Sequence, residues 1–379
     1  MLTEPDITVT VSSGGLAGEA ALSLPASVPV AHGVVCFRNS GAAVSVVASA
    51  DMRSLVLDRL GPEAGGEYDL RGSCDEVLCW SAGSSFEADL RFMDVAAEHA
   101  PDLARQASAR LTVWWLSVDH SRPGDGWTIT DEPSENAATS VLGPFLDRTS
   151  ARRWSEMLDD VFELCRYPAE LRKAPAGTAC AYHEMGRCPA ACNGSEPMSA
   201  YADRLRQAVR FDASGIEQRA GELRESMQRA SAEADFERAA AVRDRLDALP
   251  SPDERWVRAV GAITDLDIIA VVPPRRGSVV ELLRVGRHGW CRLGAVDARS
   301  AESRDEVRDM LTQPGPKDGA SGISGVLARE MIRPRRGGPI LAPTQHGACQ
   351  VVWQAVKQAA KIETASESVR ADQRDPTDV

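Results

Sequence analysis

Four cysteines constrain the fold of this chain more than any other feature. Cys165, Cys180, Cys188 and Cys192 follow the spacing C-x14-C-x7-C-x3-C, and the last three lie within the segment CAYHEMGRCPAAC. Thiols this close together are ligands of a metal or cluster, partners in disulfides, or small buried apolar side chains. Each alternative imposes a different structure on residues 165–192.

The expected cellular compartment helps to choose among these alternatives. The N-terminus MLTEPDITVT has neither the cationic start nor the apolar stretch of a secretory signal. No run reaches the roughly 18–20 apolar residues of a membrane helix. We therefore expect a cytoplasmic protein, with no membrane attachment, whose thiols stay reduced. Nine cysteines are also an odd number, which fits a complete disulfide framework poorly, so ligation is favoured.

The overall charge argues against general binding to nucleic acid. The formal net charge is −12, whereas electrostatic binding to phosphates needs clustered lysine and arginine. Binding to DNA would therefore require a local basic patch. The candidate residues, each of which is also compatible with an ordinary solvated loop, are Arg166, Arg172, Lys173, Arg275, Arg276, Arg333, Arg335 and Arg336.

The hydrophobic pattern predicts a small domain of strands and helices near the start of the chain. Residues 33–37 and 43–48 are expected to form two strands joined by a turn at 39–41. Helices are expected over 51–60, with Asp51 as the N-cap, and over 85–99. Residues 1–20 lack periodicity and are expected to form a flexible leader.

A helical hairpin is expected in the middle of the chain. Asp235 is the predicted N-cap of its second helix, in which Ala239, Val242, Leu246 and Leu249 follow coiled-coil spacing. This apolar stripe either packs on the protein's own domain or receives a helix pair from a partner. From residue 265 the pattern changes to strands. Residues 313–325 are expected to be an exposed loop, and 349–362 a last amphipathic helix.

Two motifs in this order resemble those of the UvrC family of excinucleases. The family carries a run like C-L-x-Y-x-I-G-R-C-x-x-P-C, and the corresponding run here is CAYHEMGRCPAAC. It then carries a UVR motif, F-E-x-A-A-x-x-R-D-x-I-x-x-L, and the corresponding run here is FERAAAVRDRLDAL. Weaker similarity extends over about 24–300 and includes the start of a GIY-YIG nuclease domain.

The resemblance also implies that the nuclease site is degenerate. GIY-YIG enzymes use tyrosines of two strands and a glutamate that holds a divalent ion. The corresponding positions here are Val35, Val46 and Phe92, and a phenylalanine cannot bind magnesium. No run resembles the F-D-I-S-H start of the family's second nuclease domain. We therefore expect no catalytic residues in this chain.

The resemblance implies that Cys165, Cys180, Cys188 and Cys192 hold a four-iron–four-sulfur cluster. The spacing alone leaves zinc as an alternative, because four thiolates also hold tetrahedral zinc. His183 is expected to lie outside the ligand set.

The UVR motif implies a UvrB-like helicase as partner. Phe236 would anchor the interface, while Arg243 and Asp244 would set its orientation through charge pairing. The residues expected to bind the partner are Phe236, Ala239, Ala240, Arg243, Asp244, Leu246 and Leu249.

The predicted fold class is α/β (α+β), with mixed sheets and a helical hairpin. The expected segments are a leader (1–20), a degenerate GIY-YIG-like domain (21–110), a linker with the four-cysteine site (111–200), a UVR hairpin (201–252), a C-terminal α+β domain (253–362) and a disordered tail (363–379).

The expected function is that of a non-nucleolytic scaffold in nucleotide excision repair, which contacts damaged DNA indirectly. One alternative is a single-incision endonuclease that uses displaced residues such as Arg53, Glu87 and Asp94. The other is a UVR-motif adaptor outside repair.

Overall fold

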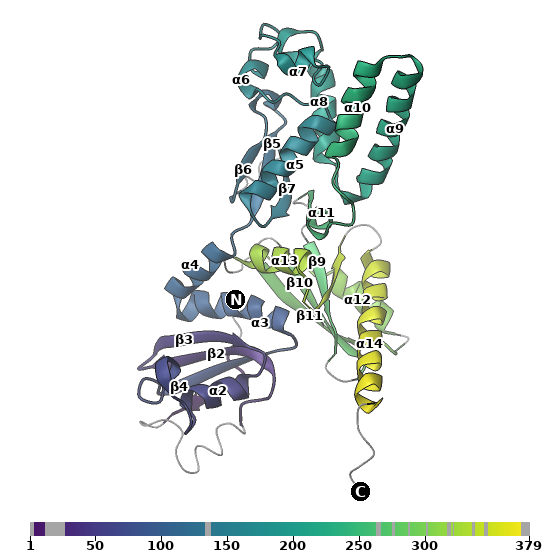
Figure 1. Cartoon of the computed structure of the whole chain (residues 1–379). Coiled ribbons are helices and arrows are strands. Elements are labelled where there is room, and N and C mark those ends of the chain that lie inside the picture. The colour runs from purple at the N-terminus through teal and green to yellow at the C-terminus, as the bar shows by residue number, and fades with distance from the viewer. Residues whose placement is uncertain are drawn as a thin grey trace. The chain divides into compact units, whose positions relative to one another are not determined.

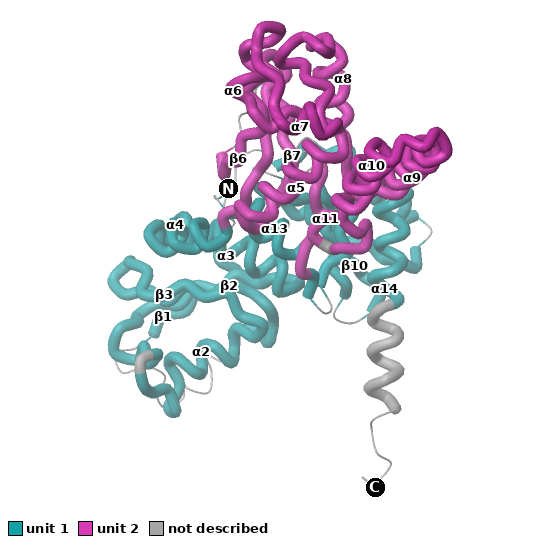
Figure 2. The backbone as a smooth tube through the Cα atoms, turned by 45° about the horizontal axis from the view of Figure 1, so that its top comes forward, with its two compact units in different colours: residues 1–111, 267–330, 334–379 teal, residues 112–266, 331–333 magenta. Residues whose placement is uncertain are grey.

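The computed structural model describes residues 4–11, 27–132, 138–262, 267–274, 277–286, 289–300, 302–316, 320, 322–335, 338–344 and 348–372. The chain forms two compact units (Figure 1 and Figure 2). Unit 1 contains residues 1–111, 267–330 and 334–379, and unit 2 contains residues 112–266 and 331–333. Unit 1 is thus assembled from both ends of the chain, and the predicted α/β class is confirmed.

The first half of unit 1 is an antiparallel sheet of order β1-β4-β2-β3 with helices packed against it. Its elements are β1 (Ile7–Thr10), β2 (His32–Asn39), β3 (Ala42–Ser49), α2 (Met52–Leu60), β4 (Glu76–Ala82), α3 (Ser85–His99) and α4 (Pro101–Arg110). Asp51 caps α2, as predicted, by accepting hydrogen bonds from the backbone N–H groups of Arg53 and Ser54.

Strand β1 lies within residues 1–20, where we expected a flexible leader. Its four residues pair with β4, with Ile7 opposite Cys79 and Thr10 opposite Glu76. The prediction was wrong here because so short a strand has almost no periodic signal and depends on its distant partner. Residues 12–26 lie outside the described residues.

The second half of unit 1 is an antiparallel sheet of order β11-β10-β9-β12. Its elements are β9 (Asp267–Val272), β10 (Val279–Gly286), β11 (Gly289–Asp297), α12 (Ser303–Leu311), α13 (Ile323–Ile332), β12 (Ile340–Pro343) and α14 (Ala348–Asp372). Helix α14 continues ten residues beyond the predicted end at 362, into the segment for which we expected disorder. Helix α13 likewise begins inside the predicted loop 313–325.

Unit 2 contains a sheet of order β6-β5-β7-β8, with helices around it, where we expected a linker. The elements are β5 (Trp114–Asp119), β6 (Thr128–Thr130), β7 (Thr139–Phe145), α5 (Arg148–Val161), α6 (Pro168–Leu171), α7 (Ala181–Glu184), α8 (Met198–Val209), α9 (Ile216–Ala232), α10 (Phe236–Ala248), α11 (Arg255–Ala259) and β8 (Gly261–Ala262). None of the described helices is both long and apolar enough to cross a bilayer.

A glycine in α13 permits a close approach to the end of α4. A Cβ at Gly325 would lie 1.9 Å from the carbonyl oxygen of Leu111. We expect Gly325→Ala to destabilise unit 1 by about 1–3 kcal/mol, because the overlap outweighs the better helix propensity of alanine. Urea denaturation followed by circular dichroism measures this change.

The matched control is Gly221→Ala in α9, where a Cβ would meet no atom within 4 Å. The same substitution should raise stability there by about 0.5–1 kcal/mol, because alanine loses less backbone entropy in a helix. Equal effects at the two positions would contradict the packing of α13 described above.

Candidate functional site

The four cysteines lie in the segment between α5 and α8. Cys165, Cys188 and Cys192 are buried, Cys180 is partly exposed, and none of them is in a disulfide. Cys165 donates to the carbonyl of Tyr167 at 3.6 Å, and Cys192 donates to the carbonyl of Thr178 at the same distance. Each of these two thiols therefore has a backbone acceptor.

The four thiols also influence one another. The neighbouring Cys165 thiol lowers the pKa of Cys188, while the same contact and burial raise the pKa of Cys165. Burial, followed by the charges of Cys188 and Cys180, raises the pKa of Cys192. The segment thus collects four soft donors within electrostatic range of one another.

As a donor set, four thiols suit zinc or an iron–sulfur cluster. Among the described residues, however, no three histidine, cysteine or acidic side chains are grouped closely enough to hold a metal ion. The ligand set remains a prediction, as does the choice between cluster and zinc. His183 hydrogen-bonds through Nδ1 to the carbonyl oxygen of Cys188 at 3.0 Å. This histidine therefore contacts the backbone of Cys188, a candidate ligand.

The basic residues beside the cysteines are paired with carboxylates. Arg166 pairs with Asp160, Arg172 lies 3.3 Å from Asp125, and Lys173 lies 2.6 Å from Glu170. Because these charges are locally balanced, the three residues do not form the unpaired basic patch that phosphate binding needs.

Of the remaining basic candidates, Arg335 pairs with Asp89 and lies 3.4 Å from Glu330. Arg333 is exposed, and Arg275, Arg276 and Arg336 lie outside the described residues.

An unusual carboxyl group lies near the end of α5. Asp159 accepts a hydrogen bond from Trp127 Nε1 at 2.9 Å, and burial raises its pKa from 3.8 to about 7. The folded protein therefore retains a proton that the unfolded chain releases between these two values. Stability is lost as pH rises from about 4 through 7 and does not recover above it.

We expect Asp159→Asn to match the wild type near pH 4 and to exceed its stability at pH 8 by about 1–3 kcal/mol. The amide oxygen can still accept from Trp127 but carries no charge. Thermal unfolding at a series of pH values measures the difference. Asp203→Asn on the exposed face of α8 is the control, and a similar pH-dependent gain there would refute the assignment to Asp159.

The predicted helical hairpin is formed by α9 and α10 (Figure 1). Asp235 caps α10, as predicted, by accepting from the backbone N–H of Arg238 at 3.0 Å. Val242 is buried, and Leu249 packs against the core of unit 2. In contrast, Phe236 is 69% exposed at the start of α10.

The residues expected to bind a partner therefore differ in their exposure to solvent. Phe236 is open to solvent, whereas Ala239, Ala240, Leu246 and Leu249 are half-buried. Asp244 is paired with Arg187 of the cysteine segment, and Arg243 lies 3.7 Å from Asp244. The charge pairing expected across a partner interface is thus partly made within the chain.

The positions expected from a GIY-YIG site do not meet on one face of the sheet. In the β2–β3 pair, Val35 lies opposite Val47 and Cys36 lies opposite Val46. Because neighbouring residues of a strand point to opposite faces, Val35 and Val46 face different cores. Val46 shares its core with Phe92, whereas Val35 packs with α2. Sequence reasoning missed this because a bulge between Phe37 and Arg38 shifts the register of the β2–β3 hairpin by one residue.

Two acidic residues of α3, Glu87 and Asp94, accept hydrogen bonds from the second half of unit 1. Glu87 is fully buried and accepts from Gly83 N at 2.8 Å, Arg91 Nε at 3.1 Å and Arg292 Nη2 at 2.7 Å. Asp94 accepts from Trp290 Nε1 at 2.8 Å. These side chains have structural partners, a role that the sequence did not predict.

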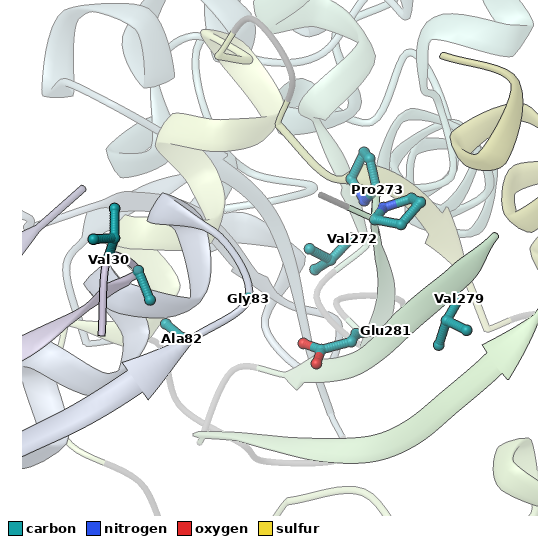
Figure 3. A pocket seen from close by; sticks show the side chains of 9 residues that line it. Val30, Ala82, Gly83, Val272, Pro273, Val279 and Glu281 are labelled. Carbon is teal, nitrogen blue, oxygen red and sulfur yellow. The ribbon is translucent and has the colours of Figure 1, made fainter. Parts of the chain in front are cut away.

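A pocket of about 720 Å³ lies beside this cluster (Figure 3). Val30, Val272 and Pro273 contribute apolar walls, and the Glu281 carboxylate points into the space. Glu281 also lies 3.5 Å from Arg292 Nη2, so the polar side of the pocket belongs to the same ion-pair cluster. No local sequence pattern indicated this pocket, since its walls come from both halves of unit 1.

Unit 2 is therefore a thiol-rich α+β domain that carries a helical hairpin with an exposed aromatic residue. Residues 113–211 match the model of the UvrC/Cho excinuclease middle domain, and residues 217–249 match that of the UvrB/uvrC motif. Over this segment the chain is UvrC-like, as the sequence motifs predicted.

Two related curated proteins are both named UvrABC system protein C. The chain is 36% identical over 148 residues to UvrABC system protein C of Nitratidesulfovibrio vulgaris, covering 38% of this chain and 21% of the relative. It is 32% identical over 158 residues to that of Natronomonas pharaonis, covering 41% and 27% respectively. The similarity thus spans less than a third of either relative. No solved structure matches the chain.

Proposed function

We propose that this chain is a nucleotide excision repair protein that acts as a non-nucleolytic adaptor for a UvrB-type partner. The observation that carries the proposal is the UVR hairpin with its exposed Phe236. A large apolar side chain at an exposed helix start is suited to anchor in a pocket of another protein. The match to the UvrB/uvrC motif supports a partner of that type.

The N-terminal domain supports a role without strand cleavage. Phe92 packs into the core that contains Val46, and Glu87 and Asp94 accept hydrogen bonds from Arg292 and Trp290. Metal-assisted phosphodiester cleavage needs open oxygen ligands for a divalent ion. The two carboxylates proposed for a displaced site are already engaged, which disfavours the endonuclease alternative.

We further propose that Cys165, Cys180, Cys188 and Cys192 bind a four-iron–four-sulfur cluster. Four free thiols in one segment, within the region that matches the UvrC/Cho middle-domain model, support the proposal. Anaerobic purification followed by iron and sulfide analysis tests it. We expect a coloured protein with both elements present, and a colourless, zinc-loaded protein would contradict this assignment.

Isothermal titration calorimetry of the full chain against a UvrB-type protein tests the adaptor role. We expect saturable binding with one site per chain. Absence of binding, with both proteins folded, would instead favour an adaptor outside repair. The binding measurement does not depend on what the cysteines hold, so the two proposals can fail separately.

A further inference from the structure

Arginines from three helices converge on the turn that ends α5. Arg219 of α9 donates to the carbonyl of Val161 at 2.8 Å, and Arg204 of α8 donates to that of Phe162 at 2.9 Å. Arg245 of α10 lies 2.6 Å from the carboxylate of Glu163. The last carbonyls of a helix have no partner within it, and cationic side chains stabilise them.

This turn leads directly to the first candidate ligand. Glu163 adopts the left-handed conformation, with φ of 54°, and the N–H of Leu164 bonds back to the carbonyl of Asp159 at 2.9 Å. Cys165 follows immediately. The arginines from α8, α9 and α10 therefore determine where the chain leaves α5 and where the Cys165 thiol lies.

Helix α10 also contacts the part of the cysteine segment that precedes Cys188. Arg245 donates to the carbonyl of Gly186 at 3.0 Å, and Asp244 pairs with Arg187. Gly186 and Arg187 directly precede Cys188. One helix of the hairpin thus contacts the chain next to both Cys165 and Cys188.

Arg245 is the central residue of this arrangement. Its side chain is only 14% exposed, and its Nε is buried without a hydrogen-bond partner. Glu163 is partly buried as well, so the pair is screened less by solvent than a surface pair. The contact between Arg245 and Glu163, together with the bond to Gly186, should therefore help to hold the hairpin on the cysteine segment.

We propose that Arg245 and Asp244 hold α10 on the four-cysteine segment, so that the hairpin and the thiol site are energetically coupled. We call these contacts of Arg245 and Asp244 the clasp. The inference rests on the proposed function for its biological meaning, since the hairpin would bind the UvrB-type partner. Coupling between two sites is reciprocal: ligation of the thiols would change affinity at the hairpin, and a bound partner would change retention at the thiols by the same factor.

Thiol alkylation of the reduced, chelator-treated full chain tests the clasp. N-ethylmaleimide labelling, followed by mass spectrometry, gives the rate at each cysteine. We expect Arg245→Gln to raise the rates at Cys165 and Cys188 about tenfold, because the Glu163 pair and the bond to Gly186 are both lost, leaving only the Asp244–Arg187 pair between α10 and this segment. Cys36, buried in unit 1, should keep its wild-type rate.

The matched control is Arg238→Gln on the same helix. Arg238 is largely exposed and pairs within the hairpin region, 3.7 Å from Glu233. Its substitution should leave all of the alkylation rates unchanged. An equal increase in both variants, or no increase with Arg245→Gln, would overturn the proposal.

Asp244→Asn with hydrogen exchange provides a second measurement, should Arg245→Gln fold poorly. This variant should accelerate amide exchange in the segment 181–188, whereas exchange as slow as in the wild type would contradict the clasp. Partner affinity, measured separately by calorimetry, distinguishes a failure of the proposed coupling from a failure of the proposed function. Unchanged thiol rates with intact partner binding overturn only the coupling, and absent partner binding with raised thiol rates overturns only the proposed function.

Discussion

Phe236→Ala should weaken binding of a UvrB-type partner by at least about 30-fold, the loss typical of an aromatic anchor at an interface. Phe236 is 69% exposed at the first position of α10. Its truncation therefore removes contact area in the complex without opening a cavity in the free protein. Calorimetric titration of the variant measures the change, and the melting temperature should match that of the wild type.

Met185→Ala provides a control for this measurement. Met185 is also exposed, at 52%, but lies in the cysteine segment outside the hairpin. Its variant should bind the partner with wild-type affinity. Equal losses of partner affinity in the two variants would show that the interface is not centred on Phe236. Unchanged affinity of Phe236→Ala would show that Phe236 does not anchor the partner.

Glu87→Ala should destabilise unit 1 by about 3–5 kcal/mol, because it leaves Arg91 and Arg292 without their shared buried carboxylate. The side chain of Glu87 is fully buried on α3. Chemical denaturation of the variant measures the loss of free energy of unfolding.

Glu98→Ala on the exposed side of the same helix is the matched control, and it should stay within about 0.5 kcal/mol of the wild type. If Glu87→Ala were equally mild, the carboxylate would not be a structural element. A role for it in metal binding would then have to be reconsidered.

Local signals predicted much of the secondary structure. Asp51 and Asp235 are N-caps because a carboxylate satisfies free N–H groups within three residues along the chain. The helix over 85–99 and the hairpin follow from short-range periodicity in the same way. The motif spacing was also sufficient to identify the UvrC-like segment.

Long-range pairing was not accessible to the same reasoning. The bond between Arg292 and Glu87 joins residues 205 apart in sequence. Strand β1 forms only by pairing with β4, which lies far from it in the sequence. The opposite orientations of Val35 and Val46 depend instead on the bulge in the β2–β3 hairpin, which no local pattern indicated. Asp244 shows the effect at the candidate site, since its pairing with Arg187 within the chain depends on how α10 packs.

Incision of damaged DNA tests the central claim most directly. The full chain is incubated with a UvrB-type partner, magnesium and a lesion-containing duplex, and the strands are separated on a denaturing gel. We predict that the partner binds while the duplex stays uncut at the level of the protein-free control. Incision that is abolished by Asp94→Ala would contradict the account and establish an endonuclease.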